Sequence, residues 1–150
     1  MIHKILLGLF AFAIFSIAQA SAPASPPPYP TTNFQWGQGY DGTGYCFEYT
    51  WDGQVLNGGR PVPERYCETQ NPSHFDWGQG QDGYGYCYQF TPQYWVMWQG
   101  RPMDNRQCEA VSPSHYQWAT ANNGYTYCFQ FTPSGYAMNQ GRPVPNQFCY

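Results

Sequence analysis

Apolar side chains alternate with polar or small ones in several short segments of this chain, a pattern that is typical of half-buried β-strands. These segments come in pairs, and the members of each pair are separated by Asp41-Gly42, Asp82-Gly83 or Asn123-Gly124. Such dipeptides are strong hairpin signals, because the favoured two-residue turn needs positive φ at both central residues. The sequence therefore predicts three β-hairpins, and no window shows helical periodicity of useful length.

A two-residue turn also determines which side chains share a face of the hairpin, because side chains alternate along a strand. In the first hairpin it places Trp36 opposite Phe47 and Gly37 opposite Cys46. The same arrangement follows for the other two hairpins. We therefore expect an aromatic stack that includes the Trp on one face, and the half-cystine beside a small residue on the other.

The cysteines recur with a constant period of 41 residues, at Cys46, Cys67, Cys87, Cys108, Cys128 and Cys149. A Trp, a Thr and a Gly-Arg-Pro segment recur with the same period, which indicates a repeat architecture. We call residues 31–70 repeat 1, residues 71–111 repeat 2 and residues 112–150 repeat 3. The predicted fold is all-β, with three tandem disulfide-stapled hairpins that pack as small modules or as a pseudo-threefold unit.

The first twenty residues have the pattern of a signal peptide. A basic start at Met1–Lys4 precedes an apolar run from Ile5 to Ala18, and small residues surround a cleavage point before Ser21. The apolar run is shorter than the roughly twenty residues that a membrane span needs. Residues 21–30 are rich in Pro and are expected to form a stiff leader. We predict a secreted or periplasmic protein without a membrane span.

Six cysteines in an exported chain, with none left over, indicate three disulfides rather than metal ligands or reactive thiols. Pairing within each repeat would close loops of about twenty residues, each worth roughly 3 kcal/mol. Pairing between repeats follows the period equally well, as Cys67–Cys87, Cys108–Cys128 and Cys46–Cys149. The sequence leaves both connectivities open, and it leaves open whether the repeats form one domain or three beads.

The composition limits the kinds of molecule that this chain can be expected to bind. Lys4 is one of the six basic residues, so five Arg face nine Asp and Glu after residue 20, for a net charge of −4. This balance offers no basic surface to nucleic acid. Leu56 is the only Leu after residue 20, whereas aromatic residues make up 20% of the whole chain. The core must therefore be built from aromatic side chains and disulfides.

Aromatic residues fall into two groups, those shared by the repeats and those that are not. The shared Trp36, Trp77 and Trp118 are expected in the core. Unshared aromatics in the loop after each hairpin are expected to contact a ligand, together with Arg101, whose guanidinium can meet hydroxyl groups. These candidates are Trp51, Tyr94, Trp95, Trp98, Arg101 and Tyr136. For the repeat 2 loop, a hydrophobic contact between neighbouring repeats is an equally good interpretation.

Some recurrent polar residues have structural interpretations. Arg60, Arg101 and Arg142 occupy one position, and residues 113–150 contain no Asp or Glu, so we expect them to stack on aromatic rings. His74 and His115 are expected at a half-exposed strand start rather than in a metal site. No catalytic triad, activated thiol or acidic pair is visible, so the sequence predicts no enzyme and no cofactor.

Gly59-Arg60-Pro61-Val62 leads into Cys67, and Trp77 follows ten residues after that cysteine. This segment resembles the repeat of ricin-B-type lectins, in which a Gly-x-Pro-Val strand runs into a Cys and a Trp follows. The resemblance implies a β-trefoil-like arrangement and binding of galactose-like sugars. The family's sugar-binding Asp, two residues after the first Cys, corresponds to Glu48 in repeat 1, so Glu48 joins the candidate ligand contacts.

These features together predict a secreted, non-enzymatic binding protein, with a glycan or an extracellular surface component as the partner. Sugar rings present flat CH faces that stack on Trp and Tyr, and this chain is rich in both. A structural or adhesive protein of the cell envelope is an alternative, because Tyr, Gln, Gly and Asn also characterise self-associating chains. A small secreted inhibitor or effector that binds a protein is a third.

Overall fold

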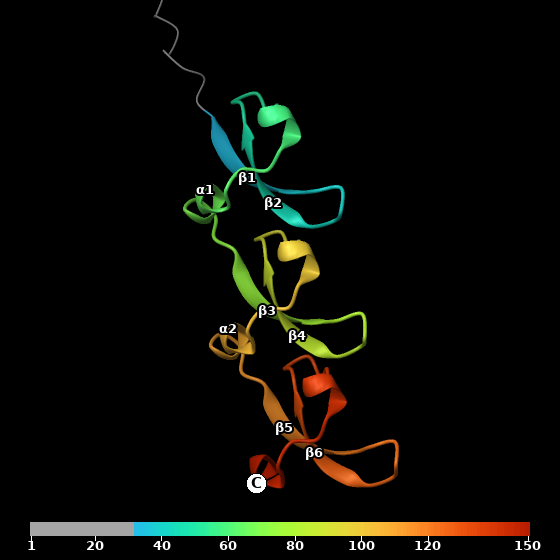
Figure 1. The fold of residues 1–150 in the computed structure, drawn as a ribbon. Helices are drawn as coiled ribbons and strands as arrows, with labels where there is room; N and C mark the ends of the chain where they lie inside the picture. The colour runs from blue at the N-terminus through green and yellow to red at the C-terminus, as the bar shows by residue number, and fades with distance from the viewer. Residues whose placement is uncertain (1–31) are drawn as a thin grey trace, which may run out of the picture.

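The computed structural model describes residues 32–150 as three β-hairpins that lie one after another in a rod (Figure 1). Each hairpin is a separate antiparallel sheet of two strands. The strands are β1 (Asn33–Gln38) with β2 (Gly44–Tyr49), β3 (His74–Gln79) with β4 (Gly85–Phe90), and β5 (His115–Thr120) with β6 (Thr126–Phe131). The mostly-β prediction is confirmed, but neither a pseudo-threefold unit nor a β-trefoil-like arrangement is found. The predicted signal peptide and the Pro-rich leader lie outside the described residues.

The loops contain short helical segments that the hydrophobic pattern of the sequence does not predict. The second cysteine of each repeat lies in such a segment. The segments are α1 (Arg65–Glu68), α2 (Asn105–Glu109), and the 3-10 turns η1 (Asn57–Gly59), η2 (Trp98–Gly100), η3 (Asn139–Gly141) and η4 (Asn146–Cys149). A single helical turn is too short to produce a 3.6-residue pattern. No helix within residues 32–150 is long and apolar enough to cross a membrane.

The disulfides join the two cysteines of the same repeat, as Cys46–Cys67, Cys87–Cys108 and Cys128–Cys149. This settles the connectivity that the sequence left open. In repeats 1 and 2 both half-cystines are at most 1% exposed. Three disulfides are typical of proteins from an oxidising environment such as the cell exterior.

The hairpin turn is one residue longer than predicted. In the first hairpin the loop is Tyr40-Asp41-Gly42, closed by a 2.7 Å hydrogen bond from Gly39 N to Thr43 O. Only Gly42 has positive φ, at 79°. This is a three-residue loop with one left-handed residue, and the extra residue shifts the strand register by one.

The shift changes the partner of every strand residue and moves the Trp to the other face. Trp36 pairs with Cys46, and Gly37 pairs with Tyr45. Trp36 therefore lies on the disulfide side, where it joins Cys46 and Cys67 in a buried cluster. The predicted aromatic stack around the Trp is wrong, because that prediction assumed the shorter turn. The prediction that the shared Trp is a core residue is confirmed for Trp36 and Trp77, each 6% exposed, and is wrong for Trp118, which is 39% exposed because no further repeat within the described residues covers it.

Neighbouring repeats share their cores. Met97 of repeat 2 is 1% exposed and belongs to the buried cluster of Trp36 in repeat 1, and Trp95 packs against the same cluster. Met138 of repeat 3 occupies the same place beside Trp77. The indole nitrogen of Trp36 also donates to the carbonyl oxygen of Asn71 over 2.7 Å. These contacts hold the hairpins in the same orientation along the rod (Figure 1).

Candidate functional site: the aromatic face

The face of each hairpin opposite the disulfide carries a row of aromatic rings, which we call the aromatic face. It arises because every second residue of the second strand is aromatic and side chains alternate along a strand. The residues are Tyr45, Phe47 and Tyr49 in repeat 1, Tyr86, Tyr88 and Phe90 in repeat 2, and Tyr127, Phe129 and Phe131 in repeat 3. Figure 1 shows the three hairpins in one orientation along the rod. Since the rows occupy the same strand positions in each hairpin, we infer that they lie on the same side of the rod.

In repeats 1 and 2, glycines in and just after the first strand let these rings lie across the neighbouring backbone, whereas repeat 3 has Ala119 and Ala121 at these positions. A Cβ at Gly37 would lie 2.8 Å from Cδ2 of Phe47, and one at Gly39 would lie 2.7 Å from Cε2 of Tyr45. Real Cβ atoms do not approach a ring this closely, so the rings occupy the space that the missing side chains leave. The rings of this face differ in exposure: Tyr88 and Phe129, at the centres of their rows, are buried at 8% and 7% exposed, and the other rings are half-buried.

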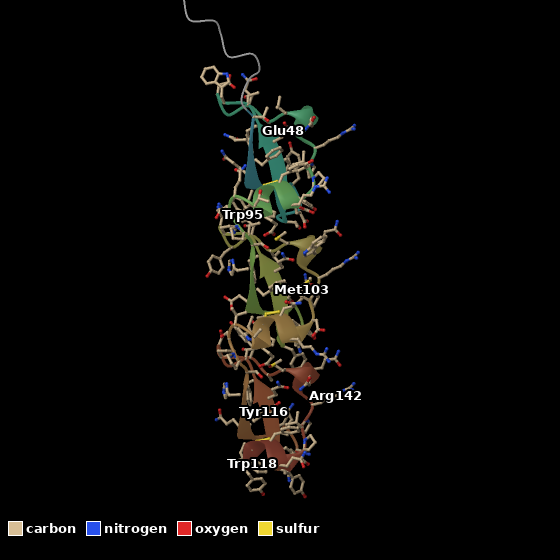
Figure 2. The ribbon with its side chains drawn as sticks, turned by 90° about the vertical axis from the view of Figure 1, so that its left-hand side faces the viewer. Glu48, Trp95, Met103, Tyr116, Trp118 and Arg142 are labelled. Atoms are coloured by element: carbon tan, nitrogen blue, oxygen red, sulfur yellow. A yellow bond between two sulfur atoms is a disulfide. The ribbon has the colours of Figure 1, made fainter. Side chains whose placement is uncertain are left out.

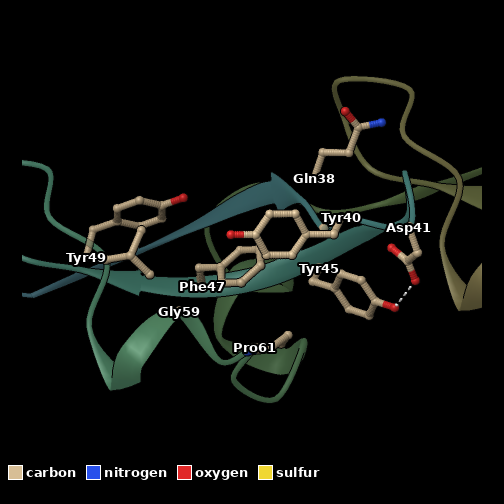
Figure 3. Close-up of a pocket in the computed structure, with 10 residues that line it drawn as sticks. Gln38, Tyr40, Asp41, Tyr45, Phe47, Tyr49, Gly59 and Pro61 are labelled. Atoms are coloured by element: carbon tan, nitrogen blue, oxygen red, sulfur yellow. Dashed lines mark hydrogen bonds between the residues drawn. The ribbon is translucent and has the colours of Figure 1, made fainter.

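In repeat 1 the aromatic face lines a groove of about 620 Å³. Figure 3 shows Tyr45, Phe47 and Tyr49 in a row along β2, with the ring of Tyr40 beside them. Tyr40 comes from the hairpin loop and is fully exposed. The remaining lining residues are Gln38, Gly39, Asp41, Val55, Gly59 and Pro61. The groove thus combines aromatic rings with few polar groups, as small-molecule sites commonly do.

The acidic residue of the hairpin loop is tied to the aromatic face by hydrogen bonds. The hydroxyl of Tyr45 donates to Oδ2 of Asp41 over 2.7 Å, and the backbone N–H of Thr43 donates to Oδ1 over 3.0 Å. The Tyr45 bond is the main cause that lowers the pKa of Asp41 below its usual value, and it raises the pKa of Tyr45. The carboxylate therefore orients a tyrosine and closes the turn.

Repeats 2 and 3 contain versions of the same bond. Tyr86 donates to Asp82 over 2.6 Å, and this bond lowers the pKa of Asp82 and raises that of Tyr86. In repeat 3 the amide of Asn123 donates to the Tyr127 hydroxyl over 3.1 Å. The turn interpretation of the two aspartates is therefore confirmed, and an uncharged amide performs the same role in repeat 3.

Repeat 2 has the longest aromatic row. Ring centroids are 6.5 Å apart for Tyr86 and Tyr88, 6.2 Å for Tyr88 and Phe90, and 6.0 Å for Phe90 and Tyr94. His74 extends it, with its ring 4.7 Å from that of Tyr94 in an edge-on arrangement. Tyr94 is 65% exposed and therefore presents its ring to solvent at one end of the row.

Two exposed aromatics of repeat 2 have a backbone conformation that their residue type disfavours. Tyr94 has φ of 63°, where repeats 1 and 3 have Gly53 and Gly135. A bulky residue in the left-handed region is uncommon and costs roughly 1–2 kcal/mol. Trp98 has φ of 55°, where the other repeats have Asn, a residue that tolerates this region better. Repeat 2 thus presents two aromatic side chains at a conformational cost.

The predicted ligand contacts do not form a single cluster. Tyr94 belongs to the aromatic face, but Trp98 donates its indole N–H to Gln89 Oε1 over 2.7 Å, and the Gln89 side chain is on the disulfide side. Glu48, at the Gln89 position of repeat 1, accepts a 2.9 Å hydrogen bond from Asn57. Trp51 is 75% exposed in the loop after β2.

Trp95 and Tyr136 lie at the junctions between repeats. Trp95 packs against the core cluster of repeat 1, near the boundary of the first two hairpins in Figure 2. Tyr136 lies at the equivalent junction, between repeats 2 and 3. A Cβ added at Gly85 of repeat 2 would lie 3.1 Å from the Cβ of Tyr136. For these two side chains the structure shows the second interpretation, a contact between neighbouring repeats.

The predicted stacking of the repeated arginines is wrong. Arg60, Arg101 and Arg142 are exposed, and the cation–π contact within the described part of the chain is Arg65 over Tyr66, at 5.1 Å. Backbone bonds hold the Gly-Arg-Pro segment instead, since Val62 N donates to Cys46 O over 2.8 Å. Arg101 remains free to meet a ligand.

The sequence predicts a packed aromatic face, and within that face Tyr88 and Phe129 are core residues at 8% and 7% exposed, whereas the other rings are half-buried. The signal that could have identified it is the alternation in the second strand, which places Tyr45, Phe47 and Tyr49 on one side and Cys46 on the other. This alternation separates the aromatic side from the disulfide side, although it does not predict burial, because Tyr88 and Phe129 are buried on the aromatic side. Assigning the Trp to the aromatic side concealed this separation.

Within residues 32–150 no three His, Cys, Asp or Glu side chains lie close enough together to hold a metal ion. Comparisons with protein-family models, with curated proteins and with solved structures found no match for this chain. The feature of this chain that points to a function is therefore the geometry of the aromatic face.

Proposed function

We propose that this chain is a secreted, non-enzymatic protein that binds carbohydrate through its aromatic face. Sugar rings have flat CH faces that stack on exposed aromatic rings, and their hydroxyls bond to nearby polar groups. The groove of repeat 1 offers both, with Tyr40 and Tyr49 beside Gln38. Secretion rests on the predicted signal peptide, and the three disulfides agree with it.

The observation that carries the proposal is the backbone conformation of Tyr94. Repeats 1 and 3 place Gly at this position, so the fold itself does not need a side chain there. A strained residue that the fold does not need is a candidate for function. Because Tyr94 is exposed at one end of the aromatic row of repeat 2, its ring is suited to stack on a ligand.

Charge and geometry narrow the class of glycan. The chain has a net charge of −3 at pH 7, which disfavours anionic polysaccharides. Three aromatic faces on one side of a rod suit a long chain of sugar units rather than a single residue. Simultaneous contact with several faces would raise the overall affinity through effective concentration. We therefore favour a neutral, extended polysaccharide.

The test is binding of the oxidised protein to a glycan array and to soluble polysaccharides. Tyr94→Gly inserts the residue of repeats 1 and 3, so the fold is kept while one platform is removed. Loss of a platform worth about 1 kcal/mol weakens binding about fivefold. Tyr40→Ala tests the groove of repeat 1 in the same way.

Trp98→Asn is the matched control, because it also inserts the residue of repeats 1 and 3 but changes the disulfide side. Binding that survives Trp98→Asn and weakens with Tyr94→Gly supports the aromatic face. The reverse result would move the site to Trp98 and Gln89. Absence of any glycan binding would contradict the proposal, and a protein captured specifically from extracellular extract would then favour an inhibitor or effector.

A further inference from the structure

The second strand of a hairpin begins with Gly at both junctions between repeats. Gly44 and Gly85 are buried, and each donates its N–H to the next repeat, over 2.9 Å to Val96 O and over 2.9 Å to Ala137 O. These bonds join the hairpin of one repeat to the loop of the following repeat. Each junction therefore depends on a close approach of two backbones.

A side chain at either position would prevent this approach. A Cβ at Gly44 would lie 3.2 Å from Trp95 Cβ and 3.3 Å from Trp95 O, and closer than 3.0 Å to Cγ2 of Thr91. The same distances at Gly85 are 3.1 Å and 3.3 Å to Tyr136, and Thr132 is again closer than 3.0 Å. Thr91 and Thr132 are fully buried, so they have no room to move away.

Repeat 3 has Thr126 at the position of these two glycines. Thr126 is exposed, and it begins β6 as Gly44 begins β2. Tyr150 likewise replaces Glu68 and Glu109, whose carboxylates accept hydrogen bonds from the first residues of the following repeat, over 3.0 Å at Ser73 N and 2.9 Å at Ser114 N. Two independent junction contacts are therefore missing from repeat 3.

The two ends of the rod otherwise keep complementary surfaces. Trp118 is 39% exposed, whereas Trp36 and Trp77 are 6% exposed beneath the following repeat. Figure 2 shows Trp118 at the C-terminal end of the rod. At the opposite end, Leu56 occupies the position of Met97 and Met138 but is only half-buried. Without Thr126, repeat 1 of a second copy could dock on repeat 3 as repeat 2 docks on repeat 1.

We propose that Thr126 closes the row of repeats and prevents a second copy of this chain from adding head to tail. The Cβ of Thr126 occupies the space that a docking Thr50 would need, because Thr50 is the repeat 1 counterpart of Thr91 and Thr132. This inference does not depend on the proposed carbohydrate binding. The exposed end of the rod at Trp118 has a shape that fits the first repeat of a second copy. The side chain of Thr126 blocks this docking.

The experiment measures the mass of the oxidised protein by sedimentation equilibrium over a range of concentrations. Wild type and Thr126→Ala are expected to have the mass of one chain, since both keep a Cβ. Thr126→Gly is expected to reach at least twice that mass as concentration rises. Thr126 is exposed and Gly is the residue at the equivalent positions, so all variants are expected to fold, which the circular dichroism spectrum checks.

A second variant tests the head-to-tail geometry. Adding Leu56→Glu to Thr126→Gly places a charge where the docking side chain would be buried, and it is expected to restore the single-chain mass. Thr126→Gly that keeps the single-chain mass at all concentrations would overturn the proposal, as would assembly of the wild type. Assembly that survives Leu56→Glu would show that the joined surfaces are different ones.

Discussion

Met97 lies in the core of a repeat to which it does not belong, in one buried cluster with Trp36 of repeat 1. Its side chain is 1% exposed. Because each repeat takes part of its core from the next, the stability of the rod depends on nearest-neighbour contacts, as in other repeat proteins. Repeat 1 is therefore expected to lose stability when a residue of repeat 2 is changed.

Met97→Ala should lower the free energy of unfolding by about 2–5 kcal/mol, the usual range for truncating a buried Met. The cause is a cavity beside Trp36 and the disulfide of repeat 1. Urea unfolding followed by tryptophan fluorescence measures the loss. Leu56→Ala is the matched control, because Leu56 has the same position in repeat 1 and covers no preceding repeat among the described residues.

The loss for Leu56→Ala should be clearly smaller than the loss for Met97→Ala. Equal losses would contradict the role of Met97 as a side chain inserted into the neighbouring core.

Tyr94→Gly should give a more stable protein than Tyr94→Ala. Both variants lack the ring, so their difference isolates the backbone conformation at φ of 63°. The left-handed region costs a residue with a Cβ roughly 1–2 kcal/mol. Glycine loses about 0.5–1 kcal/mol more on ordering than alanine, so we expect a net difference of up to about 1.5 kcal/mol. Thermal or urea unfolding measures it, and a more stable alanine variant would be inconsistent with the strained conformation.

Acid should weaken the hairpin loops of repeats 1 and 2. The pKa of Asp41 and of Asp82 is lowered from 3.8 in the folded chain, mainly by the hydrogen bonds from Tyr45 and Tyr86. A lowered pKa means that the unfolded chain binds protons first as the pH falls. The stabilisation is therefore complete above about pH 3.8 and is lost as the pH falls through the folded pKa.

The double variant Asp41→Asn and Asp82→Asn separates this effect from other acidic groups. Asn123 already performs the role in repeat 3, so the substituted loops are expected to keep their turn. Urea unfolding at neutral and at acidic pH should show a smaller acid-induced loss for the double variant than for the wild type. An identical pH dependence in the two proteins would refute the role of the aspartates.

The hairpins could be predicted from the sequence because the information is local. Alternation identifies the strands, and the Gly after Asp41, Asp82 and Asn123 identifies the turn. The register could not be predicted, because two-residue and three-residue loops both place a Gly there. Only the loop's own hydrogen bonds, from Gly39 N to Thr43 O and from Thr43 N to the Asp41 carboxylate, distinguish them.

The candidate site was predicted only in part for a related reason. Tyr94 stands out because the repeats differ at its position, which is visible in the sequence. Trp95 is equally unusual in the sequence, but it packs at a junction against the core of the preceding repeat, which includes Trp36 and Cys46. Which of two neighbouring aromatics faces solvent depends on the docking of repeat 2 on repeat 1.

By itself, the sequence determined the 41-residue period, the strands and the aromatic composition, because each depends on residues close together along the chain. The tertiary structure decided the disulfide pairing, the side of the sheet on which Trp36 lies and the burial of Met97 in the preceding repeat. These features depend on a loop one residue longer than expected and on backbones that meet at Gly44 and Gly85. Their energies come from contacts between segments distant in sequence, which a local pattern does not record.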